Sequence, residues 1–186
     1  MAGTTSKAIF EKYIPQIGVT PSTDLLIRLF GDIAAFFNVE RVGYSRMEPD
    51  RSAIQQEVQF YLSSRRCDTT QLPRLRATEY PGYFEALETQ PGVVIANDVM
   101  QDHRLKEFWE GYFRPLNIVS MLDVPVHRAG QLYGVICHEQ VGEKRHWTEE
   151  EVAAACSFAH LVALAIETEE RQKAQEALRS DRKSTR

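Results

Sequence analysis

Two acidic residues and one cysteine lie within two otherwise apolar runs of this chain. Asp123 lies in one β-rich run, and Cys137 and Glu139 lie in the next. A buried charge without a partner is costly, so a cavity, water or a basic side chain must accompany both carboxylates. Asp123 and Glu139 have the chemistry of a general acid/base couple, of a site for a polar or cationic ligand group, or of ion-pair partners for a local arginine such as Arg145.

The two runs predict an antiparallel hairpin. Residues Val119–Val126 and Leu132–Glu139 are β-rich, and the five residues between them include Gly130, which suits a loop position with positive φ. Both runs are almost continuously apolar, as is typical of central strands covered on both faces. Gly134 in the second run indicates close approach of another backbone or helix. We therefore expect this hairpin in the middle of a sheet.

Pairing Val126 with Leu132 across the loop gives the hairpin two different faces, because side chains alternate along a strand. One face is apolar and carries Leu122, Val124, Gly134 and Ile136. The other face carries Met121, Asp123, Val135, Cys137 and Glu139. A slip of one residue on one strand would scatter these side chains over both faces, so the assignment depends on the register.

Helix and strand patterns on both sides predict the elements that position this hairpin. Before the hairpin, the pattern predicts a loosely ordered lead-in over 1–18 with at most a short helix before Pro15, and then an amphipathic helix from a cap at Ser22 or Thr23 to Asn38. Next it predicts strands Val39–Met47 and Ala53–Leu62, an irregular polar segment over 63–75, a helix Ala77–Thr89, a strand Val93–Ala96 and a helix His103–Leu116. After the hairpin, it predicts a long helix that begins at the capping box Thr148/Glu151.

The helix predicted over His103–Leu116 is dense in aromatic residues. Phe108, Trp109 and Tyr112 recur at helical spacing, and Tyr83 and Phe84 lie in the preceding helix. Aromatic stripes of this kind usually pack in a core, and a recognition surface for a ligand is the alternative.

The last predicted helix changes character along its length. A stripe of small apolar residues gives way to the charged segment ETEERQKAQEALRSDRK. A helix that extends beyond its apolar core usually needs a partner, so we expect a two-helix or coiled-coil linker with Ile166, Ala174 and Leu178 near the seam. A solvated tail is the alternative.

Composition narrows the functional classes. The chain has 186 residues, of which 43% are hydrophobic and 26% charged, and a net charge of -4 with a pI near 5.8 disfavours nucleic-acid binding. We expect a cytoplasmic segment without membrane contact, because neither a signal peptide nor an apolar run of about twenty residues is evident. Cys67, Cys137 and Cys156 form no CxxC pair, which favours reduced thiols.

The order of elements and several local motifs resemble the GAF domain family, most closely the sensory modules of bacterial histidine kinases and diguanylate cyclases. The resemblance covers about residues 20 to 168. It is carried by YPGYFEALE at Tyr80–Glu88, ND…DHRLKEF at Asn97–Phe108, SMLDVPV at Ser120–Val126, GQLYGVICHE at Gly130–Glu139 and RHWTEEE at Arg145–Glu151.

The resemblance implies an α+β fold, with a central antiparallel sheet of five or six strands, the terminal helices on one face, and middle helices and loops over a ligand pocket on the other. It implies three segments: a lead-in over 1–19, a GAF domain over 20–168, and a helical signalling linker over 169–186 toward an output domain elsewhere in the parent protein. The candidate ligand-binding residues are Tyr83, Phe84, Asp98, Phe108, Trp109, Tyr112, Met121, Asp123, Cys137 and Glu139.

The resulting hypothesis is a regulatory domain, without catalytic activity of its own, that binds a small molecule and signals through its terminal helix, within a homodimer formed by the terminal helices. A dimerisation scaffold with a filled pocket is the alternative, and a redox enzyme using Cys137 is a third reading. The ligand is unknown. We expect no covalent bilin, because HRLKEFWEGYFRPL lacks cysteine, and no metal, because the histidines lack HxH or HxxxH spacing.

Overall fold

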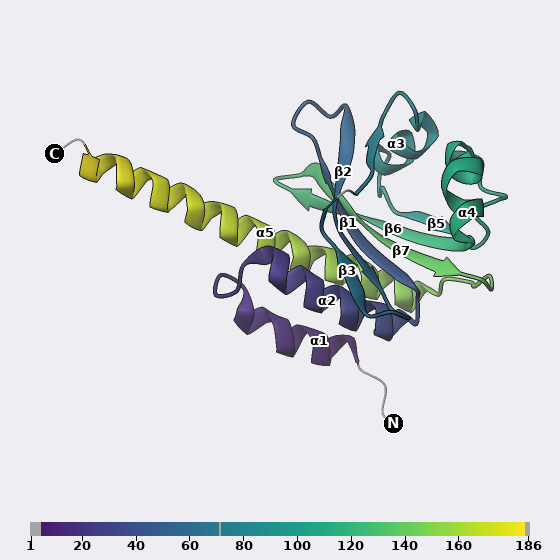
Figure 1. Cartoon of the computed structure of the whole chain (residues 1–186), viewed down its shortest axis with the longest axis horizontal. Coiled ribbons are helices and arrows are strands. Elements are labelled where there is room, and N and C mark those ends of the chain that lie inside the picture. The colour runs from purple at the N-terminus through teal and green to yellow at the C-terminus, as the bar shows by residue number, and fades with distance from the viewer. Residues whose placement is uncertain (1–4, 71, 185–186) are drawn as a thin grey trace.

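One antiparallel sheet separates two groups of helices (Figure 1). The computed structural model describes residues 5–70 and 72–184. On one face lie the helices α1 (Ser6–Tyr13), α2 (Ser22–Phe37) and α5 (Glu149–Ser184), with the short turn η1 (Ile14–Gln16) after α1. On the other face lie α3 (Pro81–Glu88) and the segment made of η2 (His103–Phe108), η3 (Trp109–Phe113) and α4 (Arg114–Leu116). This arrangement confirms the predicted fold class.

The sheet has the strand order β3-β2-β1-β7-β6-β5, and β4 pairs with β2 beside this path. The strands are β1 (Arg41–Met47), β2 (Ala53–Tyr61), β3 (Arg66–Asp68), β4 (Arg74–Arg76), β5 (Val94–Ala96), β6 (Ile118–Arg128) and β7 (Gln131–Val141). The sheet therefore has seven strands. The additional strands β3 and β4 lie in the polar segment that was expected to be irregular, and both are short pairings along β2.

The central hairpin has its predicted faces but a different register. Asp123 pairs with Cys137 and Met121 pairs with Glu139, two residues away from the expected pairing. The expected five-residue loop is wrong, because the strands meet at a tight turn in which Ala129 and Gly130 have φ of 48° and 77°. Positive φ at both positions suits a two-residue hairpin turn. A shift of two residues matches the period of a strand, so each side chain keeps its face.

The sheet separates two buried clusters of side chains. The helix-side cluster includes Leu122, Val124 and Ile136 from the hairpin, together with residues of α1, α2 and α5. The pocket-side cluster includes Met121 and Val135, together with residues of α3, η2 and η3. The alternation predicted from the sequence therefore assigns each hairpin side chain to the core that it joins.

The N-terminal segment is more ordered than the sequence indicated. Helix α1 is capped by the Thr5 side chain, and Ile9 and Tyr13 on it are fully buried. The Tyr13 hydroxyl donates a hydrogen bond to the Asp32 carboxylate on α2 at 2.9 Å. The short helix expected before Pro15 is confirmed as α1. The loose order expected for this segment is wrong for these residues, because their apolar side chains pack on α2 and close the helix-side core.

Helix α2 begins with a cap from a distant part of the chain. Its flanking residues provide no side-chain cap within the described ranges, so the caps predicted at Ser22 and Thr23 are wrong. The backbone N–H of Ser22 instead donates to the Glu169 carboxylate of α5 at 2.6 Å. Ion pairing with Lys173 and this bond lower the pKa of Glu169 to about 2. The start of α2 and the middle of α5 are thereby joined.

Helix α5 begins with the predicted capping box. The backbone N–H of Glu151 donates to the Thr148 hydroxyl at 3.2 Å, and the N–H of Thr148 donates to the Glu151 carboxylate at 3.0 Å. The first half of α5 packs on the sheet through side chains that include Phe158 and Val162. The second half extends away from the domain, as Figure 1 shows.

By length and composition alone, the segment Glu149–Ser180 of α5 could cross a membrane. Its most apolar stretch has a mean hydropathy of 1.4, contrary to the expectation that no segment is apolar enough. Of this stretch, 39% is buried within the domain, and core helices pass the same test. The absence of membrane contact stays a prediction.

A histidine lies in the helix-side core, where the sequence pattern indicated only apolar side chains. His138 is fully buried, its ring lies edge-on to Phe37 at 5.1 Å, and its Nδ1–H donates to the Leu122 carbonyl at 2.8 Å. Its Nε2 has no hydrogen-bond partner in the described part of the chain. Burial lowers the pKa of His138 from 6.5 to about 4, so the neutral ring is the folded form at neutral pH.

His138 should make the domain sensitive to acid. Unfolding restores an ordinary pKa, so its contribution to the free energy of unfolding is present above pH 6.5 and is lost as the pH falls toward 4. This contribution alone should fall by on the order of 2 kcal/mol between pH 7 and pH 5. Urea unfolding isolates it as a difference: from pH 7 to pH 5, His138→Asn, whose amide can keep the bond to Leu122, should gain about that much stability relative to the unmodified chain. The same substitution at the exposed His160 should cause no such relative gain, and a pH response of His138→Asn identical to that of the unmodified chain would contradict the assignment.

Candidate ligand pocket

A small cavity lies on the pocket side of the sheet. Its volume is about 40 Å³, which is room for about three water-sized groups. Strands β1, β2, β6 and β7 form its floor, and α3, η2, η3 and the segment leading into β4 form its walls. It is lined by Ser45, Ile54, Gln56, Pro73, Leu75, Tyr83, Phe108, Tyr112, Phe113, Met121, Asp123, Cys137 and Glu139.

Asp123 lies at the centre of the floor and has only neutral partners. The Tyr83 hydroxyl and the Cys137 thiol both donate to its Oδ2, the latter at 3.3 Å. The side chain is 1% exposed, and Oδ1 has no partner among the described residues. Burial, with a smaller contribution from the Glu139 charge, raises the pKa of Asp123 from 3.8 to about 7. The carboxyl group is therefore poised between its two protonation states.

Glu139, the second acid of the floor, is already neutralised. Its Oε2 accepts a hydrogen bond from Nε of Arg41 at 2.6 Å, and its Oε1 accepts one from the Tyr112 hydroxyl at 2.9 Å. Arg41 is 8% exposed and also donates to the Tyr112 hydroxyl at 3.0 Å. Arg145, named from the sequence as the local arginine, pairs with Glu151 instead. The two acids thus differ: Glu139 belongs to a closed ion pair, whereas Asp123 does not.

The aromatic wall is built by an irregular helical segment. The sequence indicated one regular helix over His103–Leu116, which is wrong, because the chain passes from a 3₁₀ turn in η2 to a π turn in η3. A π turn brings residues five apart onto one side, which here places Phe113 beside Phe108 with ring centroids 5.4 Å apart. Phe108 also meets Tyr83 edge-on at 5.2 Å. These rings line the cavity together with the carboxylates.

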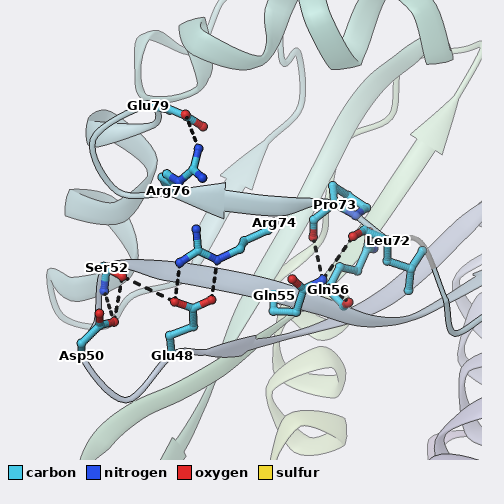
Figure 2. A network of polar contacts seen from close by, with 10 residues as sticks. All are labelled: Glu48, Asp50, Ser52, Gln55, Gln56, Leu72, Pro73, Arg74, Arg76 and Glu79. Carbon is cyan, nitrogen blue, oxygen red and sulfur yellow. Dashed lines mark hydrogen bonds and ion pairs between the residues drawn. The ribbon is translucent and has the colours of Figure 1, made fainter.

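A strap formed by Pro73 and β4 closes one side of the cavity. Pro73 and Leu75 of the strap line the cavity. Figure 2 shows how the strap is held: Arg74 donates to both carboxylate oxygens of Glu48, at 2.5 and 2.6 Å, and the Gln55 amide donates to backbone carbonyls that include that of Pro73, at 3.3 Å. Ion pairs this open to solvent contribute little to stability, so these contacts hold the strap only weakly.

The structure brings together seven of the ten predicted ligand-binding residues. Those that line the cavity are Tyr83, Phe108, Tyr112, Met121, Asp123, Cys137 and Glu139. Phe84 packs in the pocket-side core instead, Trp109 donates to the Val99 carbonyl at 2.8 Å, and Asp98 pairs with Lys144 outside the cavity. These three residues do not line the cavity: Phe84 and Trp109 are sequence neighbours of the lining residues Tyr83 and Phe108, and Asp98 lies in the segment between β5 and η2.

Sequence reasoning missed the lining residues from the first hairpin and the strap. These are Ser45, Ile54, Gln56, Pro73 and Leu75, with Phe113 added by the π turn. Alternation along β1 and β2 would have found Ser45 and Gln56, once the first hairpin was placed beside the second. The strap carries no periodic pattern, so its residues gave no such signal.

The chemistry of the lining disfavours a reactive thiol. Burial and the neighbouring acids raise the pKa of Cys137 well above its ordinary value, so the sulfur is a thiol and not the nucleophilic thiolate. Among the residues that the structure describes, no three His, Cys, Asp or Glu side chains are placed to hold a metal ion.

A single sheet that separates a helical core from a pocket-bearing side defines a class of small α+β domains. The chain belongs to the GAF domain family, whose sequence pattern matches residues 22–166. This is a family of regulatory and sensory domains. No curated protein sequence matches the chain significantly.

Solved structures of the same fold come from several kinds of protein. The phycocyanobilin-bound GAF domain of a cyanobacterial phytochrome has a TM-score of 0.72 and 16% identity, over 88% of this chain and 94% of that one. The GAF domain of a phosphoenolpyruvate-protein phosphotransferase from Coxiella burnetii has a TM-score of 0.70 and 16% identity, over 94% and 99%. Residues 122 to 287 of a methyl-accepting chemotaxis protein have a TM-score of 0.60 and 18% identity, over 87% and 93%. At these identities the likeness is one of fold.

Replacing Asp123 should stabilise the domain in mild alkali. Its raised pKa means that the ionised group is disfavoured in the folded state, so stability is lost as the pH rises from about 4 through about 7. Asp123→Asn removes this loss, and relative to the unmodified chain it should gain on the order of 2 kcal/mol between pH 5 and pH 8, measured by urea unfolding.

Glu139→Gln is the matched comparison and should act in the opposite direction. Removing this charge leaves Arg41 buried without its partner, which should destabilise the domain by about 3–5 kcal/mol at pH 7. If Asp123→Asn and Glu139→Gln destabilise the domain by similar amounts at pH 8, Asp123 must also be paired with a basic side chain.

Proposed function

We propose that this chain is a sensory domain that binds a small molecule in the cavity and transmits its occupancy through α5 to an output domain. The observation that carries the proposal is the carboxylate of Asp123. It lies on the cavity floor with one oxygen unpartnered within the described ranges, although the surrounding side chains are well packed. A core selected only for stability would favour an apolar residue here, whereas a binding site needs a polar group for its ligand.

Strand β6 supports a route from the cavity to α5. Asp123 faces the cavity, and its neighbours Leu122 and Val124 point through the sheet into the helix-side core, where Phe158 and Val162 of α5 also pack. A ligand that shifts β6 would therefore act on both faces, since packed cores move between discrete arrangements. The ligand must bind one arrangement more tightly than the other.

Polar contacts also tie the point where α5 leaves the domain to the sheet. The Glu170 carboxylate pairs with Arg46 on β1, at 3.2 Å, and with Arg128 on β6, and it accepts a hydrogen bond from Tyr133 on β7. Glu169, the preceding residue, caps α2. Strand β1 carries Arg46 next to Ser45, a cavity residue, so the junction and the cavity share one strand.

The cavity volume limits the ligand. About 40 Å³ is well below the few hundred Å³ typical of ligand pockets, so the ligand is small or the strap and aromatic wall move to admit it. This volume also argues against a tetrapyrrole. Cys137, the cysteine that lines the cavity, is a hydrogen-bonded thiol on a strand. The absence of a covalent bilin stays a prediction.

The second candidate function is a scaffold whose pocket is filled by its own side chains. The small cavity volume favours it directly, and the terminal helices would then carry the function through dimerisation. The two proposals differ in whether any compound binds at the cavity.

A ligand screen with a cavity-filled control separates the two. Ser45 is 4% exposed and lines the cavity, so Ser45→Leu should fill the available space. In a thermal-shift screen of small molecules, a pocket ligand at about one hundred times its dissociation constant should stabilise the unmodified chain by about 2.7 kcal/mol and leave Ser45→Leu unchanged. A screen in which every stabilising compound acts equally on both proteins would favour the scaffold.

We also propose that α5 mediates a homodimer. One stripe of α5 repeats at alternating steps of three and four residues, all of them exposed: Ala153, Ser157, His160, Leu164, Glu167, Arg171, Ala174 and Leu178. Ile166, which was expected near the seam, is 3% exposed and packs in the helix-side core, so that expectation is wrong. Leu164 and Leu178 are 50% and 65% exposed and supply the apolar positions.

Leu178→Glu should weaken this dimer and leave the globular part folded. The substitution places a like charge in both copies at one level of the seam. Light scattering should show a lower mass than for the unmodified chain at the same concentration, with an unchanged melting temperature. Ser180→Glu adds the same charge two residues away, off the stripe, and should keep the original mass. Equal masses for all three proteins would count against a dimer through α5.

A cytoplasmic location, an output domain elsewhere in the parent protein and the absence of nucleic-acid contact complete the proposal. The names of similar structures, a phosphotransferase, a phytochrome and a chemotaxis protein, support a signalling setting. The division into a lead-in over 1–19, a domain over 20–168 and a linker over 169–186 is proposed as well. The family match to 22–166 supports the central part, and the helix α1 within the lead-in folds onto it.

A further inference from the structure

We infer that the cavity binds a small organic cation with at least one N–H donor, a protonated alkylamine, through Asp123 and the aromatic rings facing it. This inference rests on the proposed function, since it names the ligand class of the same pocket. Four features of the cavity lead to it: the charge of the lining, the unpartnered oxygen, the aromatic wall and the volume.

The lining has an uncompensated negative charge. It contains two carboxylates, Asp123 and Glu139, and no lysine, arginine or histidine in its described part. Arg41 lies behind Glu139 and forms an ion pair with it at 2.6 Å, which accounts for one of the two charges. The hydrogen-bond donors of Asp123 are the neutral groups of Tyr83 and Cys137. An ionised Asp123 therefore needs a cation that the described lining does not provide.

The unpartnered atom is an acceptor. Both protein donors bond to Oδ2 of Asp123, which leaves Oδ1 as a buried acceptor within a residue that is 1% exposed. A carboxylate oxygen prefers a charged N–H donor, and the bond is stronger when both groups are ionised. An ammonium group supplies that donor and the missing charge together.

The aromatic part of the lining suits the alkyl part and the charge of such a ligand. Tyr83, Phe108, Tyr112 and Phe113 line the cavity, with neighbouring ring centroids 5.2 to 6.0 Å apart. Aromatic faces attract cations, and clusters of rings with a carboxylate are a common form of ammonium site. A carboxylate ligand would meet two acids and the negative ring faces, and it is therefore disfavoured.

The volume sets the size of the cation. About 40 Å³ accommodates about three water-sized groups, which corresponds to an amine of about three or four non-hydrogen atoms. Ethylammonium is of this size.

Binding should depend on pH through Asp123. The groups that face it are Tyr83 from α3 and Cys137 and Glu139 from β7, with Tyr112 from η3 and Arg41 from β1 bonded to Glu139. A cation favours the ionised carboxylate, whereas an alkylamine stays protonated up to a pH near 10. Because the pKa of Asp123 is about 7 without a ligand, the affinity should rise about 10-fold from pH 6 to pH 8.

The test follows the methyl group of Met121, which lines the cavity, by NMR during titration of the full chain. The probes are ethylammonium chloride, sodium acetate and 1-propanol, which have similar size and different charge. Ethylammonium should shift the Met121 signal saturably, with the expected rise in affinity between pH 6 and pH 8. Asp123→Asn should lose about 10-fold or more in affinity together with the pH dependence. Asp98→Asn, the same change at an acid outside the cavity, should retain both.

The outcomes separate failure of the ligand class from failure of the pocket. If acetate or propanol shifts Met121 as strongly as ethylammonium, or if Asp123→Asn binds ethylammonium with unchanged affinity, the ligand class is wrong and the pocket remains a binding site. If none of the probes shifts Met121, the inference of an amine ligand is overturned. If, in addition, the screen yields no compound sensitive to Ser45→Leu, the proposed sensory function fails as well.

Discussion

The burial of an unneutralised carboxylate is the constraint on which this structure depends. Asp123 lies in the middle of strand β6, between β7 and β5, and its Oδ1 lacks a partner within the described ranges. Such a group opposes folding when ionised, and the rest of the domain must supply the compensating stability. The two apolar cores on either side of the sheet do so. The cavity is the space beside this carboxylate that the surrounding side chains leave unfilled.

The sheet connects the cavity, where Asp123 lies, to the helices on its other face. Because its side chains alternate, one strand presents Asp123 to the cavity and Leu122 and Val124 to the helices. The polar junction at Glu169 and Glu170 adds a second connection at the point where α5 extends from the domain. The exposed half of α5 is therefore attached to the sheet through both apolar packing and ion pairs, so a displacement of the floor has a path to it.

The sequence predicted the features that follow from local period and failed where distant segments meet. Strand alternation assigned Met121, Asp123, Cys137 and Glu139 to one face even though the register was two residues off, since an even shift preserves faces. The capping box of α5 is equally local. The pairing of Glu139 with Arg41 and the capping of α2 by Glu169 join residues 98 and 147 positions apart, and no local pattern reports them. The π turn at Trp109–Phe113 falls within residues that repeat at helical spacing, so that spacing did not reveal it.

The difference between the two acids bears on how much a ligand can achieve. Raising the pKa of Asp123 from 3.8 to about 7 corresponds to a cost of a few kcal/mol for the ionised group in the fold. A ligand that neutralises this group can recover part of that cost, and allosteric coupling between sites typically amounts to about 1–3 kcal/mol. A ligand can recover no such free energy at Glu139, because the charge of Glu139 is already neutralised by Arg41. In the proposed function, the free energy available for signalling is therefore concentrated at Asp123, on the strand that contacts both the cavity and the terminal helix.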